Sequence, residues 1–237
     1  RGASNCIMTR SEEQKARGII AASAGNHAQG VALGSRMAHC KSTVVMPEGA
    51  PLAKAEATKG YGAEVVLYGK TFDESLAKAQ EIQQETGAYF VHPYDDPAVI
   101  AGQGTIGLEI LEQNPYIESI VVPVGGGGLL AGIAAAVKQV NPKVKVYGVQ
   151  TEQAPAMYLC KKENKWVSHG VGRTIADGIA VGMPGKLTWK LISQYVDDML
   201  LVNEEDICAA MLLMLERGKM VVEGAGAAPL AALLHHI

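Results

Sequence analysis

Four consecutive glycines, at positions 125–128, separate an apolar strand-like segment from an apolar helix-like segment. A backbone without Cβ atoms can turn sharply and bring its N–H groups close to a ligand. The helix expected behind the glycines would point the positive end of its dipole at the same place. The pattern predicts a phosphate-binding loop, but not a P-loop, because the Lys of G-x-x-x-x-G-K-[ST] is absent. The alternative interpretation is a flexible turn.

A second loop at residues 21–30 has the same order of apolar strand, small-residue turn and helix. Ser23, Asn26 and the backbone N–H groups of residues 25–27 would lie at the N-terminus of that helix. Such a site suits an anion smaller than a pyrophosphate, such as a carboxylate, and Asn26 can also donate to a phenolate oxygen. An ordinary helix cap explains Ser and Asn equally well. Two such loops together favour a site for a phosphate and a carboxylate.

Strand-like and helix-like segments alternate along the chain, which predicts parallel βαβ units in an α/β fold. Helices would cover both faces of open, mostly parallel sheets, and ligands would bind at the carboxyl ends of the strands. The strands are expected at residues 18–22, 42–46, 63–68, 89–92, 119–124, 144–150 and 198–202. The helices are expected at residues 27–38, 52–61, 72–85, 105–113, 129–140, 204–217 and 226–237.

The composition indicates a globular protein and excludes several partner classes. The 237 residues are 48% hydrophobic and 19% charged, which is enough to bury a sizeable core. A net charge of -3 gives no reason to expect nucleic acid or an anionic membrane as a partner. No apolar run has the length of a membrane span, and no signal-peptide pattern opens the chain. The lack of these two patterns, together with four scattered cysteines, predicts a cytoplasmic protein with reduced thiols.

A series of short motifs resembles the fold-type II pyridoxal-phosphate enzymes, whose fold is that of the tryptophan synthase β subunit. The resemblance lies in the serine/threonine dehydratase and serine racemase branch and is strongest to catabolic threonine dehydratase (threonine ammonia-lyase). It rests on Arg1-Gly2-Ala3, Ser23-Ala24-Gly25-Asn26-His27-Ala28-Gln29-Gly30, Met46-Pro47, Gly62-Ala63-Glu64-Val65, His92-Pro93, Gly102-Gln103-Gly104-Thr105, the 125–129 loop and Ala176-Asp177-Gly178.

The resemblance implies pyridoxal 5'-phosphate as cofactor and assigns roles to both loops. It implies that the phosphate is held by Gly125, Gly126, Gly127, Gly128 and Leu129. It implies that Asn26 bonds the ring hydroxyl and that the substrate carboxylate is bound by Ser23, Ala24, Gly25, Asn26 and His27. Gly178 would lie near the substrate side chain and Glu223 near the cofactor ring. The alternative role of Glu223 is that of an acidic residue opening the helix after Gly224.

The resemblance also predicts lobes and the place of the catalytic base. Residues 18–98 would form a small, mobile lobe with the substrate loop, and residues 1–17 and 99–237 a large lobe that binds the cofactor phosphate. In the family, the Schiff-base lysine lies two residues before the arginine that matches Arg1. We therefore expect the catalytic lysine upstream of this sequence, and both ends of the chain to be truncated.

The implied reaction is β-elimination from L-threonine to 2-oxobutanoate and ammonia, with L-serine as a second substrate. In the related eukaryotic serine racemases, a Ser takes the position of Ala24 and exchanges a proton on the second face of the substrate. Ala24 therefore favours a dehydratase, although a serine racemase or another fold-type II enzyme stays an alternative. Two further alternatives are a Rossmann NAD-dependent oxidoreductase, with Glu152 at the ribose, and a non-catalytic binding module.

The expected partners are a small amino-acid substrate and further copies of the chain, as a homodimer or homotetramer. In racemase-like members, a divalent ion is bound at positions that we match to Glu152, Ala156 and Tyr158. A tyrosine is a poor ligand for Mg²⁺ or Ca²⁺. We therefore expect no tight divalent metal site.

Overall fold

The computed structural model describes residues 1–235 and divides the chain into two compact units, Arg1–Gly102 (unit 1) and Gln103–Ile237 (unit 2). The last two residues of the helix predicted at 226–237 lie outside the described residues. Among the described residues, no helix is both long enough and apolar enough to cross a membrane.

Unit 1 is built on a four-stranded parallel sheet in the order β3-β2-β1-β4, as its alternating pattern predicts. Its strands are β1 (Ile19–Ala22), β2 (Ser42–Met46), β3 (Glu64–Leu67) and β4 (Tyr89–Phe90). Its helices are α1 (Gly2–Met8), α2 (Glu12–Ala16), α3 (Asn26–Met37), α4 (Leu52–Gly60) and α5 (Phe72–Thr86), followed by the first residues of α6 (Pro97–Gln113).

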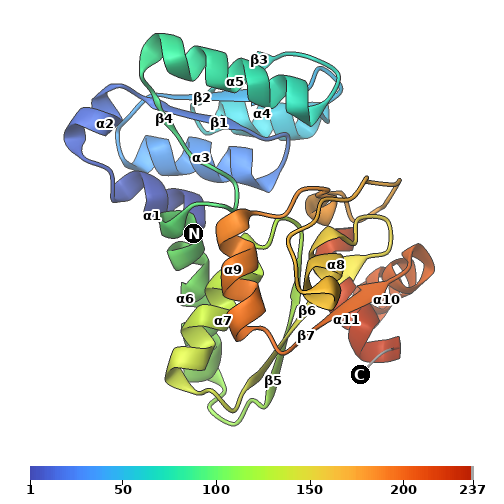
Figure 1. Ribbon diagram of the computed structural model, residues 1–237. Helices are drawn as coiled ribbons and strands as arrows, with labels where there is room; N and C mark the ends of the chain where they lie inside the picture. The colour runs from blue at the N-terminus through green and yellow to red at the C-terminus, as the bar shows by residue number, and fades with distance from the viewer. Residues whose placement is uncertain (236–237) are drawn as a thin grey trace. The chain divides into compact units, whose positions relative to one another are not determined.

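Strand β1 is buried on both faces, which is typical of an interior strand in a parallel sheet. Ile19 and Ala21 belong to a core cluster shared with α1 and α3. Ile20 and Ala22 belong to a cluster on the other face, shared with α5. Figure 1 shows α5 on one side of this sheet and α1 and α3 on the other. Helices therefore pack on both faces of the strand, and its carboxyl end leads into the loop at residues 23–27.

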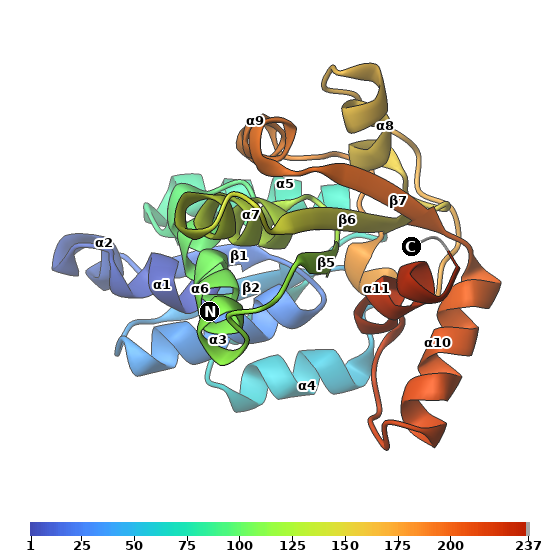
Figure 2. The ribbon, with the colours of Figure 1, turned by 90° about the horizontal axis from the view of Figure 1, so that it is seen from below.

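Unit 2 contains a three-stranded parallel sheet in the order β5-β6-β7. Helix α11 contacts all three strands, and α10 lies beside α11 (Figure 2). The strands are β5 (Ser119–Pro123), β6 (Lys145–Thr151) and β7 (Asp198–Val202). The helices are α7 (Gly128–Val140), α8 (Ala156–Glu163), the short 3-10 helix η1 (Asp177–Ile179), α9 (Lys186–Tyr195), α10 (Glu204–Glu216) and α11 (Gly224–His235).

Helix α6 begins at Pro97, eight residues before the helix predicted at residues 105–113, and Gly102 and Gly104 lie inside it. A Cβ atom on Gly102 would lie 2.8 Å from Gly2 Cα, and one on Gly104 would lie 3.0 Å from the carbonyl oxygen of Gly132. These glycines allow a close approach of helix backbones, and that packing outweighs their low helix propensity.

The boundary between the two units falls within α6, after Gly102. Residues 1–17, expected in the large lobe, pack in unit 1, where a Cβ atom on Gly34 of α3 would lie 3.1 Å from Ser4 Cα of α1. The division of the whole protein into a small mobile lobe and a large lobe stays a prediction.

Candidate functional site

The glycine loop of unit 2 connects β5 to α7, and its backbone conformation requires glycine. Gly127 precedes the first residue of α7 with a φ of 98°, in the left-handed region. A Cβ atom there would lie 2.6 Å from Met157 Cε and 2.9 Å from Ile192 Cδ1. Both the positive φ and the packing behind the loop therefore exclude a side chain at position 127.

Three successive carbonyl oxygens of this loop accept hydrogen bonds from the protein. The Gly126 oxygen accepts from Thr188 Oγ1 at 2.7 Å, the Gly127 oxygen from Ala131 N at 2.9 Å, and the Gly125 oxygen from Gln150 Nε2 at 3.5 Å. Within residues 1–235, the backbone N–H groups of residues 125–129 donate to no protein acceptor. Carbonyl oxygens that pointed into the site would repel an anion, but here they point toward protein donors. N–H groups at a helix N-terminus attract an anion. The loop therefore fits a phosphate group.

The other site residues predicted in this unit lie beside one another. A Cβ atom on Gly178 would be 3.4 Å from Glu223 Oε1, and one on Gly125 would be 3.3 Å from the Cα atom of Ile179. Unit 2 thus brings the start of the glycine loop, η1 and Glu223 together. The carbonyl oxygen of Glu223 also accepts from Ala227 N at 3.1 Å, so both interpretations of Glu223, near the site and at the start of α11, are compatible with its position.

Glu204 holds the segment that leads to Gly178, and sequence reasoning missed this role. Its carboxylate accepts from Thr174 Oγ1 at 2.7 Å, from Ile175 N at 2.7 Å and from Thr151 Oγ1 at 2.9 Å. Burial opposes ionisation of Glu204, but these three donors outweigh it and lower the pKa of the carboxyl. In the sequence, Glu204 resembles an ordinary acidic residue in the first turn of a helix capped by Asn203.

In unit 1, the predicted substrate loop follows β1 and opens α3. Ser23 N donates to the carbonyl oxygen of Val45 at 3.1 Å, and Ser23 Oγ accepts from Gly25 N at 3.2 Å. The side chain of Ser23 thus shapes the turn before α3, but the N-cap of α3 is Gly25 and no side chain caps the helix, so the alternative interpretation of Ser23 and Asn26 as ordinary helix caps is wrong. A Cβ atom on Gly25 would meet no atom within 4 Å, and Asn26 is exposed. The loop therefore leaves open space in front of its backbone.

His27 anchors this loop to the end of β4 and carries no charge at neutral pH. Its Nε2 atom lies 3.0 Å from the carbonyl oxygen of Val91, which can only accept, so Nε2 bears the proton. Burial lowers the pKa of His27 to about 4. A carboxylate at this loop would therefore be bound by N–H dipoles rather than by a histidine cation.

The three positions matched to a divalent metal do not form a ligand set of carboxylates. Glu152 is exposed after β6, Ala156 is the buried first residue of α8, and Tyr158 lies in that helix. In the part of the chain that the structure describes, no group of three His, Cys, Asp or Glu side chains is placed to hold a metal ion. The expected lack of a divalent site stays a prediction.

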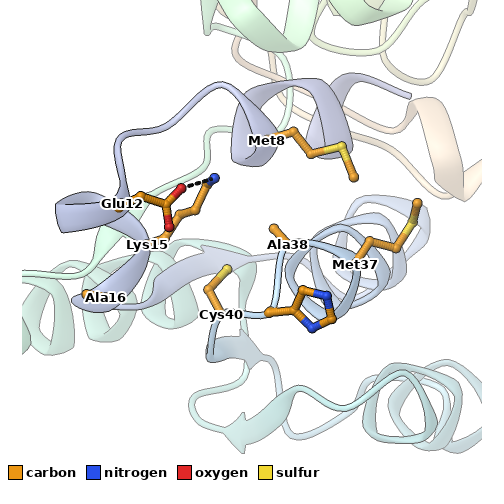
Figure 3. Close-up of a pocket in the computed structure, with 8 residues that line it drawn as sticks. Met8, Glu12, Lys15, Ala16, Met37, Ala38 and Cys40 are labelled. Carbon is orange, nitrogen blue, oxygen red and sulfur yellow. Dashed lines mark hydrogen bonds and ion pairs between the residues drawn. The ribbon is translucent and has the colours of Figure 1, made fainter.

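A cavity of about 590 Å³ lies within unit 1, among α1, α2 and the end of α3. Figure 3 shows Met8 and Met37 on one side of it and the Lys15–Glu12 ion pair, at 2.9 Å, near Ala16. None of the predicted site residues lines this cavity.

Comparison with known proteins places the chain among relatives of the predicted kind. It is 53% identical over 237 residues to an L-threonine ammonia-lyase from Thermotoga maritima, covering 100% of the chain and 59% of that protein. It is 51% identical over 234 residues to L-threonine dehydratase catabolic TdcB from Staphylococcus aureus, covering 99% of the chain and 68% of that protein. The chain thus spans less than two thirds of the length of the Thermotoga relative.

Solved structures agree in fold. The processed form of threonine deaminase isoform 2 from Solanum lycopersicum matches with a TM-score of 0.94 and 42% identity, covering 98% of this chain and 67% of that one. Maize serine racemase matches with a TM-score of 0.96 and 36% identity, covering 99% of this chain and 71% of that one. The family model for pyridoxal-phosphate dependent enzymes matches residues 1–237. The chain therefore belongs to the pyridoxal-phosphate dependent enzyme family.

Proposed function

We propose that the protein containing this chain deaminates L-threonine to 2-oxobutanoate and ammonia, with L-serine as a second substrate. The observation that carries the proposal is the arrangement in unit 2, where a glycine loop suited to a phosphate packs against Ile179, and the neighbouring Gly178 lies beside Glu223. Relatives at 51–53% identity bear the names threonine ammonia-lyase and threonine dehydratase, which supports the same activity.

Residues 125–129 bind the cofactor phosphate through their N–H groups in this proposal. Bound pyridoxal phosphate supplies an electron sink for the charge that develops at the substrate Cα. Asn26 donates to the ring hydroxyl, and Glu223 lies near the ring. Because the phosphate is held by backbone groups, the loop orients the cofactor without contributing a titrating side chain.

The substrate carboxylate is bound by the loop of Ser23, Ala24, Gly25, Asn26 and His27. N–H groups at the start of α3 provide the attraction, because His27 is neutral at physiological pH. Gly178 lies near the substrate side chain in this proposal, and the predicted base is the lysine upstream of Arg1. The methyl group that distinguishes threonine from serine is worth about 1–3 kcal/mol in a pocket.

Serine racemisation is the second candidate, because maize serine racemase shares the fold closely. Racemisation requires proton exchange on both faces of the substrate, whereas elimination requires it on one. Ala24 has no exchangeable proton on its side chain, which favours elimination. A Rossmann oxidoreductase and a non-catalytic module have no comparable support from the family.

The test is the release of 2-oxo acids by the full-length protein with pyridoxal phosphate, from L-threonine and from L-serine. We expect 2-oxobutanoate from threonine and a smaller release of pyruvate from serine. Formation of D-serine without either 2-oxo acid would replace the proposal with racemisation. Cofactor binding with no turnover of either amino acid would contradict both.

Location and assembly belong to the same proposal. We expect a cytoplasmic protein, in keeping with the four cysteines, all of which are free thiols. We also expect a homodimer or homotetramer, which sedimentation of the full-length protein would test; a monomer would contradict it.

A further inference from the structure

The carbonyl oxygen of Gly126 is held by two donors from the start of α9. Thr188 Oγ1 lies 2.7 Å from this oxygen, and Gly185 N lies 3.1 Å from it. Thr188 Oγ1 is also 3.1 Å from the Gly185 carbonyl oxygen, but a hydroxyl has one proton, and the shorter contact is to Gly126. Thr188 is fully buried, so its hydroxyl lies behind the loop, inside the protein.

The direction of this carbonyl sets the direction of the next N–H group. In a trans peptide, the C=O of one residue and the N–H of the following residue point in opposite directions. Holding the Gly126 carbonyl toward α9 therefore turns the Gly127 N–H away from α9. The bonds to the Gly125 and Gly127 carbonyls act in the same way on the N–H groups of Gly126 and Gly128.

Thr188 is well placed to control this peptide, because the surrounding backbone is otherwise permissive. Glycine populates positive and negative φ about equally, so four glycines in succession do not determine by themselves which side their N–H groups face. The Thr188 hydroxyl also lies 2.9 Å from the place a Cβ atom on Gly127 would take. The hydroxyl thus bonds Gly126 and also lies beside Gly127, the second residue of the peptide that it orients.

We infer that Thr188 is a positioning residue for phosphate recognition: it holds the Gly126 carbonyl so that the Gly127 N–H faces the phosphate. The inference rests on the proposed assignment of residues 125–129 to the cofactor phosphate. Thr188 itself does not contact the phosphate. Its loss weakens binding of the phosphorylated cofactor and leaves the ring contacts from other residues in place.

The experiment measures the dissociation constants of pyridoxal phosphate and of pyridoxal, which lacks the phosphate, with the full-length apoprotein. Their ratio isolates the contribution of the phosphate, because any bond to the aldehyde is common to both ligands. Thr188→Val keeps the shape and removes the hydroxyl, and we expect it to reduce the preference for pyridoxal phosphate about tenfold. Thr188→Ser keeps the hydroxyl and should stay within about threefold of the wild type.

A second variant removes the other donor to the same oxygen without changing Thr188. Gly185 has a φ of -65°, which proline adopts, and Gly185→Pro deletes its N–H. We expect the preference for the phosphorylated ligand to fall in this variant too. It also keeps the test decisive if Thr188→Val does not fold.

Asp197→Asn serves as the control for general destabilisation of the same unit. Asp197 contacts Lys138, near the end of α7, at 2.7 Å and Lys145 at 3.0 Å, so the variant loosens α7 at the end away from the glycine loop. It should lower the melting temperature and leave the ratio of the two dissociation constants unchanged.

The outcomes separate this inference from the assignment of the loop. A wild type that binds pyridoxal phosphate no better than pyridoxal would show that the loop does not bind the phosphate, and the inference would fall with it. A wild type with a clear preference that Thr188→Val and Gly185→Pro both retain would overturn the role of Thr188 alone. Loss of the preference in Asp197→Asn would show a general structural effect and would also overturn it.

Discussion

The loops at residues 23–27 and 125–129 both connect a parallel strand to the N-terminus of a helix through small residues. They differ in which protein atoms pack against their backbone. Behind Gly127, the side chains of Met157, Ile192 and Thr188 occupy the space that a Cβ atom would need. Around Gly25, that space is open. The glycine loop of unit 2 is therefore shaped by packing from inside the protein, whereas the loop of unit 1 is shaped by its own side chains.

The difference indicates how each loop binds its ligand. In unit 2, buried groups donate hydrogen bonds to three successive carbonyls, which leaves a row of N–H groups suited to a phosphate. In unit 1, Ser23 forms a short-range turn and His27 makes one anchor to Val91. The loop of unit 1 has more room beside its backbone, which suits a site for a substrate that must enter and leave.

The first prediction compares the same substitution, glycine to alanine, in the two loops, and the largest effect is expected at Gly127. Gly127→Ala should destabilise the protein by about 3 kcal/mol, because it combines a positive φ with a clash inside the core. Gly25→Ala should cost less than about 1 kcal/mol, because its Cβ atom enters open space. Urea unfolding of both variants measures the difference, and equal losses would contradict the contrast between the loops.

The second prediction concerns acid, which should loosen the anchor of the unit 1 loop. The pKa of His27 is about 4 in the folded protein against an ordinary 6.5, so the unfolded chain binds more protons between these values. Its contribution to stability is complete above pH 6.5 and is lost as the pH falls toward 4, by at most about 3 kcal/mol.

A matched variant separates His27 from the other titrating groups. His27→Gln keeps an N–H donor for the Val91 carbonyl but does not titrate. Urea unfolding at several pH values should show a smaller loss between pH 6.5 and 4 in the variant than in the wild type. Carboxyl groups with lowered pKa, including Glu204, contribute equally to both proteins. Identical pH profiles would show that His27 is protonated normally.

The third prediction weakens the support of Gly178 without changing the glycine loop. Glu204→Gln leaves one acceptor oxygen for three donors and should cost about 1–3 kcal/mol of stability. The KM for threonine should rise about three- to tenfold as Gly178 shifts. The preference for pyridoxal phosphate over pyridoxal should not change. A variant that loses phosphate affinity and keeps its KM would reverse the assignment of the two segments.

The smallest expected effect is a gain of function in the unit 1 loop. Ala24→Ser adds a hydroxyl to a partly exposed position and should change stability by less than about 0.5 kcal/mol. We expect it to introduce slow formation of D-serine from L-serine, which chiral chromatography detects, with the dehydratase reaction still dominant. The absence of any D-serine would remove the argument that Ala24 distinguishes the two reactions.

Much of the fold could be predicted from the sequence. The strands β1, β2, β5, β6 and β7 were predicted from apolar runs, each followed along the chain by a turn or a helix-like segment. Both sheets are parallel, as expected. The prediction was wrong for the first part of α6, since glycines usually end helices. There, the close approach of neighbouring backbones outweighs the local preference.

The candidate site, like the fold, could be predicted from the sequence only in part. The two glycine-containing loops, Gly178 and Glu223 were predicted from motifs, because turn chemistry and family patterns are written in short stretches of sequence. Glu204 was missed, because its three donors come from Thr151, Thr174 and Ile175, which lie 29 to 53 residues away along the chain.

Local residue patterns were enough to predict where the backbone turns, which segments form most of the strands and helices, and the family to which the chain belongs. The direction in which the flexible glycines face depends on packing between distant segments and could not be predicted from those patterns. Glycine has no conformational preference strong enough to direct its own peptide groups. That direction depends on a buried hydroxyl at Thr188, 62 residues from the carbonyl of Gly126 that it binds.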